Sequence, residues 1–210
     1  MIETSTNILQ SARLSRSDRL EKRGKLIQRL SVIVPPLFAK AHIRDFSPLF
    51  RAKLLKVVDP AAMAEGLLLW GAPGVGKTHA MAAIGRYIVT RGGRCRRMTY
   101  EMLALQIRDT FKANSTKTEL GVIQPLLDCQ FLFIEDVGTT VSSGSQESDF
   151  SLRTLLVILD HRLEQRRPTF LTSNKSVEGL RQTFDARIAS RLQAFMVIQM
   201  AGADKRKGRS

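Results

Sequence analysis

Residues 66–78 read GLLLWGAPGVGKT. The run Leu67–Trp70 is short and continuously apolar, which predicts a strand that is buried on both faces of a sheet. The next eight residues, Gly71–Thr78, have the GxxxxGK[ST] spacing of a phosphate-binding loop, here called the phosphate loop. Residues Lys77–Thr90 then predict a helix that ends before Gly92-Gly93. The order strand, glycine-rich loop, helix predicts a P-loop NTPase that binds ATP.

The chemistry of the phosphate loop follows from its residue types. Glycines let the backbone curl so that successive N–H groups point inward at the β-phosphate. The helix that begins near Lys77 adds the partial positive charge of its N-terminus. We expect Lys77 to bridge the β- and γ-phosphates and Thr78 to bind Mg²⁺ through its hydroxyl. The predicted nucleotide-binding residues are Gly71, Ala72, Pro73, Gly74, Val75, Gly76, Lys77, Thr78 and His79.

Two later strands are predicted to end with polar side chains. The run Gln130–Glu135 is followed by Asp136, and Thr169–Ser173 by Asn174. Because an open α/β sheet binds its ligand at the carboxyl ends of its strands, these groups should meet the phosphate loop. We expect Glu135 to lie over the Mg²⁺ ion and Asp136 beside the attacking water, which makes the chain an ATPase. An asparagine in this position either orients that water or only forms a turn.

Helical and strand patterns alternate along the rest of the chain. Helices are expected at Phe46–Val58, Glu101–Phe111 and Asp149–Gln165, and a further strand at Arg96–Tyr100, with a Ser- and Gly-rich loop at 139–148. This alternation predicts an α/β fold with a parallel sheet flanked by helices. A basic helical arm is expected over residues 1–34, with its helix at about Leu9–Leu30, then the ATPase domain over 35–200 and a basic tail over 201–210.

Charge and composition narrow the choice of partners. The formal net charge is +14, from 33 Lys and Arg against 19 Asp and Glu, which favours nucleic acid as a partner. Cys95 and Cys129 have no spacing typical of a zinc site or a disulfide framework. The N-terminus is polar and no apolar run approaches the length of a membrane span, which predicts a cytoplasmic protein without a membrane partner.

Several stretches together resemble the AAA+ ATPases of the DnaC-type helicase loaders and the IstB transposition helper. They are GLLLWGAPGVGKTHAMAAIG, FLFIEDVG, RRPTFLTSNKS, DARIASRL and the closing IQMAGADKR. The resemblance implies an AAA+ fold without a C-terminal lid domain, and a sensor role for Asn174. It also implies that Arg191 reaches the ATP of a neighbouring subunit in a homo-oligomer, with Arg187 as a second candidate. The acid at the metal position is Glu135 where this family usually has Asp.

An assembly of such subunits would line a groove for single-stranded DNA. Basic residues neutralise phosphates and aromatic residues stack on bases, so the candidate contacts are Tyr100, Arg108, Phe111 and Lys112. The favoured function is an ATP-controlled protein that assembles on DNA and loads or recruits a replicative helicase. The alternatives are an IstB-like helper that recruits a transposase to duplex DNA, an ATP switch that does not hydrolyse, and a small-molecule kinase.

Overall fold

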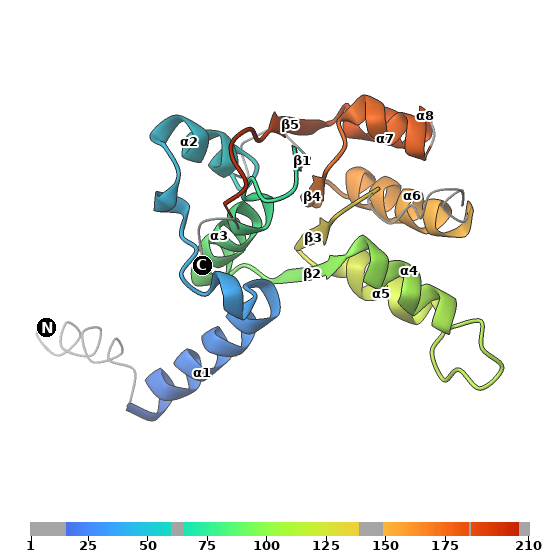
Figure 1. The fold of residues 1–210 in the computed structure, drawn as a ribbon. Coiled ribbons are helices and arrows are strands. Elements are labelled where there is room, and N and C mark those ends of the chain that lie inside the picture. The colour runs from blue at the N-terminus through green and yellow to red at the C-terminus, as the bar shows by residue number, and fades with distance from the viewer. Residues whose placement is uncertain (1–15, 60–64, 139–148, 185, 206–210) are drawn as a thin grey trace, which may run out of the picture.

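A five-stranded, wholly parallel sheet forms the centre of the molecule (Figure 1). The computed structural model describes residues 16–59, 65–138, 149–184 and 186–205. The strand order is β2-β3-β4-β1-β5, so β1 lies between two strands that come later in the chain. The strands are β1 Gly66–Trp70, β2 Cys95–Thr99, β3 Phe131–Glu135, β4 Thr169–Ser173 and β5 Phe195–Gln199.

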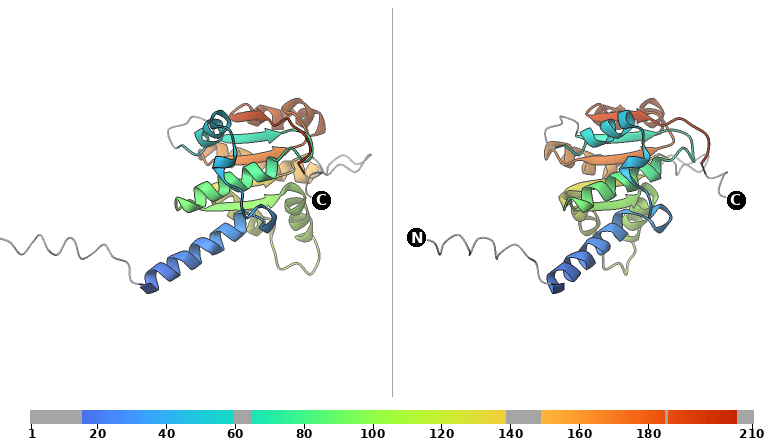
Figure 2. Two further views of the ribbon diagram at one scale, coloured as in Figure 1. Left: turned by 60° about the vertical axis from the view of Figure 1, so that its left-hand side comes forward. Right: turned by 90° about the vertical axis from the view of Figure 1, so that its left-hand side faces the viewer.

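Helices cover both faces of this sheet, as the alternating pattern predicts (Figures 1 and 2). On one face α1, α2 and α3 pack together, and on the other α4, α5 and α6 with α7 and α8. Leu67 and Leu69 belong to the first core and Leu68 to the second, which confirms that β1 is buried on both faces. The helices are α1 Arg16–Ile33, α2 Pro48–Lys56, α3 Lys77–Thr90, α4 Tyr100–Asp109, α5 Glu119–Asp128, α6 Asp149–Glu164, α7 Val177–Thr183 and α8 Ala186–Leu192.

The predicted arm is partly built into the domain. Helix α1 projects from the body at its N-terminal end, but Ile33 in its last turn is fully buried (Figure 2). A Cβ at position 85 of α3 would collide with the Ile33 side chain, so Gly85 permits this close approach. Helix α1 ends just before Pro35 and Pro36, which cannot continue it. The first seven residues of the expected helix, 9–15, lie outside the described residues, as do loop 139–148 and tail residues 206–210.

Helix α5 and strand β5 are among the elements that the sequence does not predict. Helix α5 begins with the Thr118 hydroxyl accepting from the Gly121 N–H. Strand β5 pairs with β1 at the edge of the sheet and buries only Phe195 and Ile198. Its apolar run, residues 195–198, is as short as that of β1 and no phosphate loop follows it, and such a short run alone does not distinguish a strand from a helix.

A buried arginine ties the second core to the amino ends of two strands. The Arg162 side chain of α6 has no exposed surface, and burial lowers the pKa of its guanidinium. The guanidinium donates to Leu126 O at 2.8 Å, Cys129 O at 2.8 Å and Pro168 O at 2.8 Å, and to the Thr169 hydroxyl at 2.9 Å. One side chain therefore fixes the end of α5 and the starts of β3 and β4.

We predict that Arg162→Met lowers the free energy of unfolding by about 3 kcal/mol or more, because the carbonyl groups at the end of α5 and before β3 and β4 lose the charged donor that they share. Chemical denaturation followed by circular dichroism measures this. Arg153→Met, at an exposed position of the same helix, is the matched control and should change stability by less than about 0.5 kcal/mol. Equal effects of the two substitutions would show that the Arg162 contacts contribute little.

Candidate functional site

The phosphate loop connects β1 to α3 at the carboxyl edge of the sheet, where the sequence places it (Figure 1). Gly74 and Gly76 have φ values of 81° and 105°, a left-handed region that favours glycine. Gly76 immediately precedes Lys77, the first residue of α3. The loop therefore curls directly into a helix N-terminus, which is the arrangement that binds phosphate groups.

Lys77 is the buried cation of this edge, with only 6% of its surface exposed. Its ammonium donates to Gly71 O at 2.6 Å, to Ala72 O at 2.9 Å and to Asn174 Oδ1 at 2.7 Å. Asn174 directly follows β4, which is the neighbour of β1 in the sheet. The structure therefore brings together two site residues that are 97 positions apart in the sequence.

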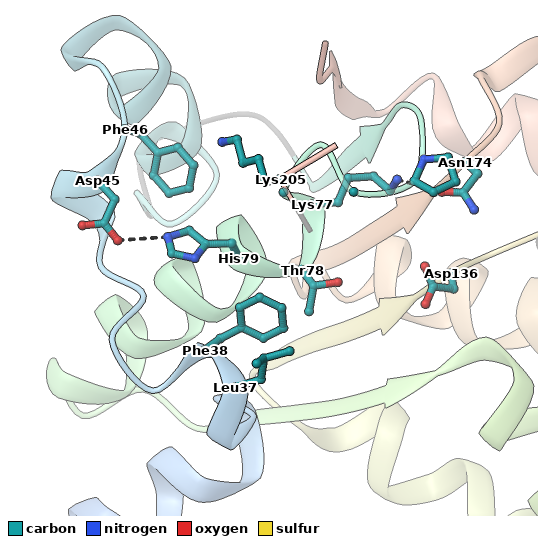
Figure 3. A pocket seen from close by; sticks show the side chains of 13 residues that line it. Leu37, Phe38, Asp45, Phe46, Lys77, Thr78, His79, Asp136, Asn174 and Lys205 are labelled. Carbon is teal, nitrogen blue, oxygen red and sulfur yellow. Dashed lines mark hydrogen bonds and ion pairs between the residues drawn. The ribbon is translucent and has the colours of Figure 1, made fainter. Parts of the chain in front are cut away.

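A cavity of about 720 Å³ opens beside the loop (Figure 3). This volume suits a nucleotide, since ligand pockets commonly measure about 300–1,000 Å³. Its lining contains most of the predicted nucleotide-binding residues, together with residues from outside the loop. The lining residues are Leu37, Phe38, Asp45, Phe46, Pro73, Gly74, Gly76, Lys77, Thr78, His79, Asp136, Asn174 and Lys205.

Of the two adjacent acids Glu135 and Asp136, it is Asp136 that lines this cavity with Thr78 (Figure 3). Asp136 has a positive φ of 60°, and its N–H donates to the Thr172 hydroxyl at 2.9 Å, so β4 holds the turn. Strained backbone of this kind is typical of functional sites. The Glu135 side chain is 2% exposed and accepts from Arg97 Nε of β2 at 2.6 Å. This differs from the expectation that Glu135 lies over the metal, because Arg97 holds its carboxylate within the sheet.

The opposite end of the cavity is aromatic and was not predicted. Phe38 and Phe46 both meet the His79 ring edge-on, with ring centroids 6.1 and 5.7 Å away. His79 Nε2 is 2.9 Å from Asp45 Oδ2 (Figure 3). The His42 backbone N–H, with help from His79, holds the pKa of the Asp45 carboxyl below its usual value. His79 is among the predicted nucleotide-binding residues, but Phe38, Asp45 and Phe46 precede Gly71 by 25 to 33 positions and form no motif with the loop, so the sequence alone gives no signal for them.

The segment after β5 also reaches the phosphate loop, which the sequence did not indicate. Met200 N donates to Trp70 O at 2.7 Å, and Lys205 N donates to Gly74 O at 3.1 Å. Lys205 is one of the lining residues of the cavity. The described part of the predicted tail is therefore a wall of the site.

The two arginines of α8 lie outside the cavity lining. Arg191 donates to the Asp160 carboxylate of α6 through Nε at 2.6 Å and Nη2 at 2.9 Å, a two-point contact. Its Nη1 also donates to the Arg187 carbonyl at 3.3 Å. Neither arginine lines the cavity of its own chain, so a role for them in nucleotide chemistry would need a second subunit.

The four candidate DNA contacts do not share one environment. Tyr100 is fully buried in the second core and packs edge-on against Phe184, so its inclusion was wrong. The strand ends earlier than expected, which makes Tyr100 the first residue of α4 and turns its ring inward. Arg108, Phe111 and Lys112 are exposed, with 62% of Phe111 accessible, and Lys112 pairs with Asp109 at 2.6 Å. These three remain candidates.

Neither cysteine has the low thiol pKa of a reactive cysteine. Burial raises the pKa of the Cys95 thiol to about 12 and also raises the pKa of Cys129, so both stay protonated near neutral pH.

Of the helices that the structure describes, none is both long and apolar enough to cross a bilayer.

Comparison with known proteins agrees with this geometry. The family model described as "IstB-like ATP binding protein" matches residues 49–199, which include every element from β1 to β5. The chain belongs to this family. The phosphate loop, Asp136, Asn174 and Arg191 all lie inside the matched region.

Curated relatives of this IstB-like chain are named replicative helicase loaders. DnaC of Buchnera aphidicola subsp. Baizongia pistaciae is 29% identical over 123 residues, 59% of this chain and 48% of that protein. DnaI of Bacillus subtilis strain 168 is 25% identical over 162 residues, 77% of this chain and 47% of that protein. The chain therefore spans about half the length of the curated relatives it matches.

Solved structures share the AAA+ fold. A crystal structure of DnaI superposes with a TM-score of 0.67 at 21% identity and covers 85% of this chain and 99% of that one. A structure of the replication initiator DnaA bound to AMPPCP and single-stranded DNA also has a TM-score of 0.67, at 17% identity, and covers 80% of this chain and 51% of that one. These similarities confirm the predicted α/β fold of the P-loop NTPases.

Proposed function

We propose that this chain binds and hydrolyses ATP with Mg²⁺, and that it uses this cycle to help deliver a replicative helicase to DNA. The observation that carries the proposal is the convergence of Lys77, Thr78, Asp136 and Asn174 on one cavity of an IstB-like chain. A phosphate-loop lysine alone indicates nucleotide binding. An acid and an amide from two further strands in the same cavity favour hydrolysis.

The two ends of the cavity fit the two ends of ATP. The phosphate loop and Lys77 would hold the phosphates, with the Lys77 ammonium exchanging backbone carbonyl partners for phosphate oxygens. At the other end, Phe38, Phe46 and His79 present aromatic surface on which a purine ring can pack. The Asp45 carboxylate, already an acceptor, lies in this part of the lining.

The residues present also fit Mg²⁺. The Thr78 hydroxyl and the Asp136 carboxylate line the same cavity, and both offer oxygen atoms, which this ion prefers. Among the described residues there is no cluster of three or more metal-binding side chains, in keeping with an ion that takes its remaining ligands from phosphates and water. Bound there, the ion would neutralise charge on the β- and γ-phosphates.

The chain's own groups would then act as follows. Asp136 orients the attacking water and accepts its proton, and Asn174, whose Oδ1 accepts from Lys77, donates through Nδ2 to the γ-phosphate or that water. Arg191, bound to Asp160 in the isolated chain, would release that partner and reach the nucleotide of a neighbouring subunit. A trans arginine stabilises the charge on the transferring phosphoryl group.

The helicase partner rests on the names of the relatives, DnaC and DnaI. DNA binding is supported by the charge of +14, by exposed Arg108, Phe111 and Lys112, and by the DnaA structure that contains single-stranded DNA. The family description favours a second candidate, an IstB-like helper that recruits a transposase to duplex DNA. Affinity capture with the tagged chain, on single-stranded and duplex DNA, distinguishes a helicase from a transposase as the partner.

We predict that Asp136→Asn keeps ATP binding and lowers steady-state turnover at least about 100-fold, the contribution of a general base. Glu135→Gln should lower turnover less than Asp136→Asn, because the Glu135 carboxylate is occupied by Arg97. Phosphate release measures turnover, and a fluorescent ATP analogue measures binding. The reverse order, with Glu135→Gln the more damaging, would assign the metal and water chemistry to Glu135.

A mixing experiment tests the trans arginine. Arg191→Ala should bind ATP but hydrolyse it poorly, and Lys77→Ala should not bind ATP. If Arg191 acts between subunits, a mixture of the two variants on DNA should regain turnover that neither variant has alone. At some subunit interfaces the intact phosphate loop of an Arg191→Ala subunit would face the intact Arg191 of a Lys77→Ala subunit. Full turnover by Arg191→Ala alone, or no gain on mixing, would contradict the trans role.

A further inference from the structure

The segment that follows β5 crosses directly over the phosphate loop. It is joined to β1 and the loop by two backbone hydrogen bonds, Met200 N to Trp70 O at 2.7 Å and Lys205 N to Gly74 O at 3.1 Å. The second bond joins the end of this segment to the middle of the loop. The position of Lys205 is thus fixed relative to the loop by the main chain.

Two glycines of the phosphate loop, Gly71 and Gly74, leave the space that this segment occupies. A Cβ on Gly71 would collide with the carbonyl oxygen of Met200, and a Cβ on Gly74 would collide with the carboxylate of Asp204. The absence of side chains at these two positions thus admits the segment as well as curling the loop. Residues 200–205 and the phosphate loop are packed as one unit.

The Lys205 side chain extends into the proposed nucleotide cavity (Figure 3). Its Nζ lies 3.5 Å from the point where a Cβ on Gly76 would be, next to the loop residue that precedes Lys77. In Figure 3 the Lys205 ammonium is on the side of Phe46 and His79, whereas Asn174 and Asp136 are on the other side of Lys77. Asp45, the lining carboxylate on the same side as Phe46 and His79, is engaged by His79 and by the His42 backbone.

We propose that Lys205 is a further nucleotide-binding residue, which contacts the α- and β-phosphates from the side of the loop opposite Asn174. The inference rests on the proposed ATP binding and adds to it a second cation in the same chain. Lys77 reaches the phosphates from inside the domain, and Lys205 reaches them from the segment that closes over the loop. Because Lys205 lies away from the Asn174 end, it binds ADP and ATP alike, while Asn174 distinguishes them.

Nucleotide titrations of the full chain test this proposal. For Lys205→Ala we expect ATP and ADP to bind about tenfold more weakly or worse, by similar factors, since a hydrogen bond to a charged group is lost in both complexes. Adenosine, which has no phosphates, should bind unchanged. Lys205→Arg should retain most of the affinity. Asn174→Ala should weaken ATP more than ADP.

The matched control is Lys53→Ala, at an exposed position of α2 outside the cavity lining, which removes the same charge. If Lys53→Ala and Lys205→Ala caused equal, small losses of ATP affinity, the loss in Lys205→Ala would come only from the lower net charge of the chain. That result would overturn the proposal. So would a loss of adenosine binding equal to the loss of ATP binding. A wild-type chain that binds no ATP would instead remove the proposed function itself, which is a distinguishable result.

Discussion

The Lys77 ammonium is the point on which the site depends. It joins the carbonyls of Gly71 and Ala72 to the side chain of Asn174, and so connects the loop after β1 with the end of β4. A buried cation is tolerated only when polar partners replace its water, and three oxygen acceptors within 2.9 Å do so here. The same ammonium that organises the carboxyl edge of the sheet is the group that would bind phosphate.

The rest of the fold holds this edge in place from both faces. Helix α3 starts at Lys77 and buries nine of its 14 residues between α1 and the sheet, while Arg162 fixes the opposite, amino-terminal edge of the sheet. Around the cavity each wall comes from a different part of the chain: the aromatic wall from residues 37–46, the acid from the end of β3, the amide from the end of β4 and Lys205 from the segment after β5. A rigid sheet thus carries a site whose groups are far apart in sequence.

The predictable parts were those with local signals. The apolar run of β1, the loop spacing and the helix Lys77–Thr90 can be located from sequence because each is encoded by consecutive residues. Tyr100 was misjudged because a shift of one residue decides which way its side chain turns, and no local signal shows that Arg97 on the adjacent strand pairs with Glu135. Phe38, Phe46 and Lys205 were missed because only the folded chain brings them to the loop.

Every proposed role of the site requires that this cavity binds ATP through Lys77. Isothermal titration calorimetry of the wild-type chain with ATP and Mg²⁺, repeated with Lys77→Met, tests it most directly. We predict saturable binding of one nucleotide per chain by the wild type, weaker binding without Mg²⁺, and none detectable for Lys77→Met at the same concentrations. Equal affinity of the two proteins for ATP would contradict it.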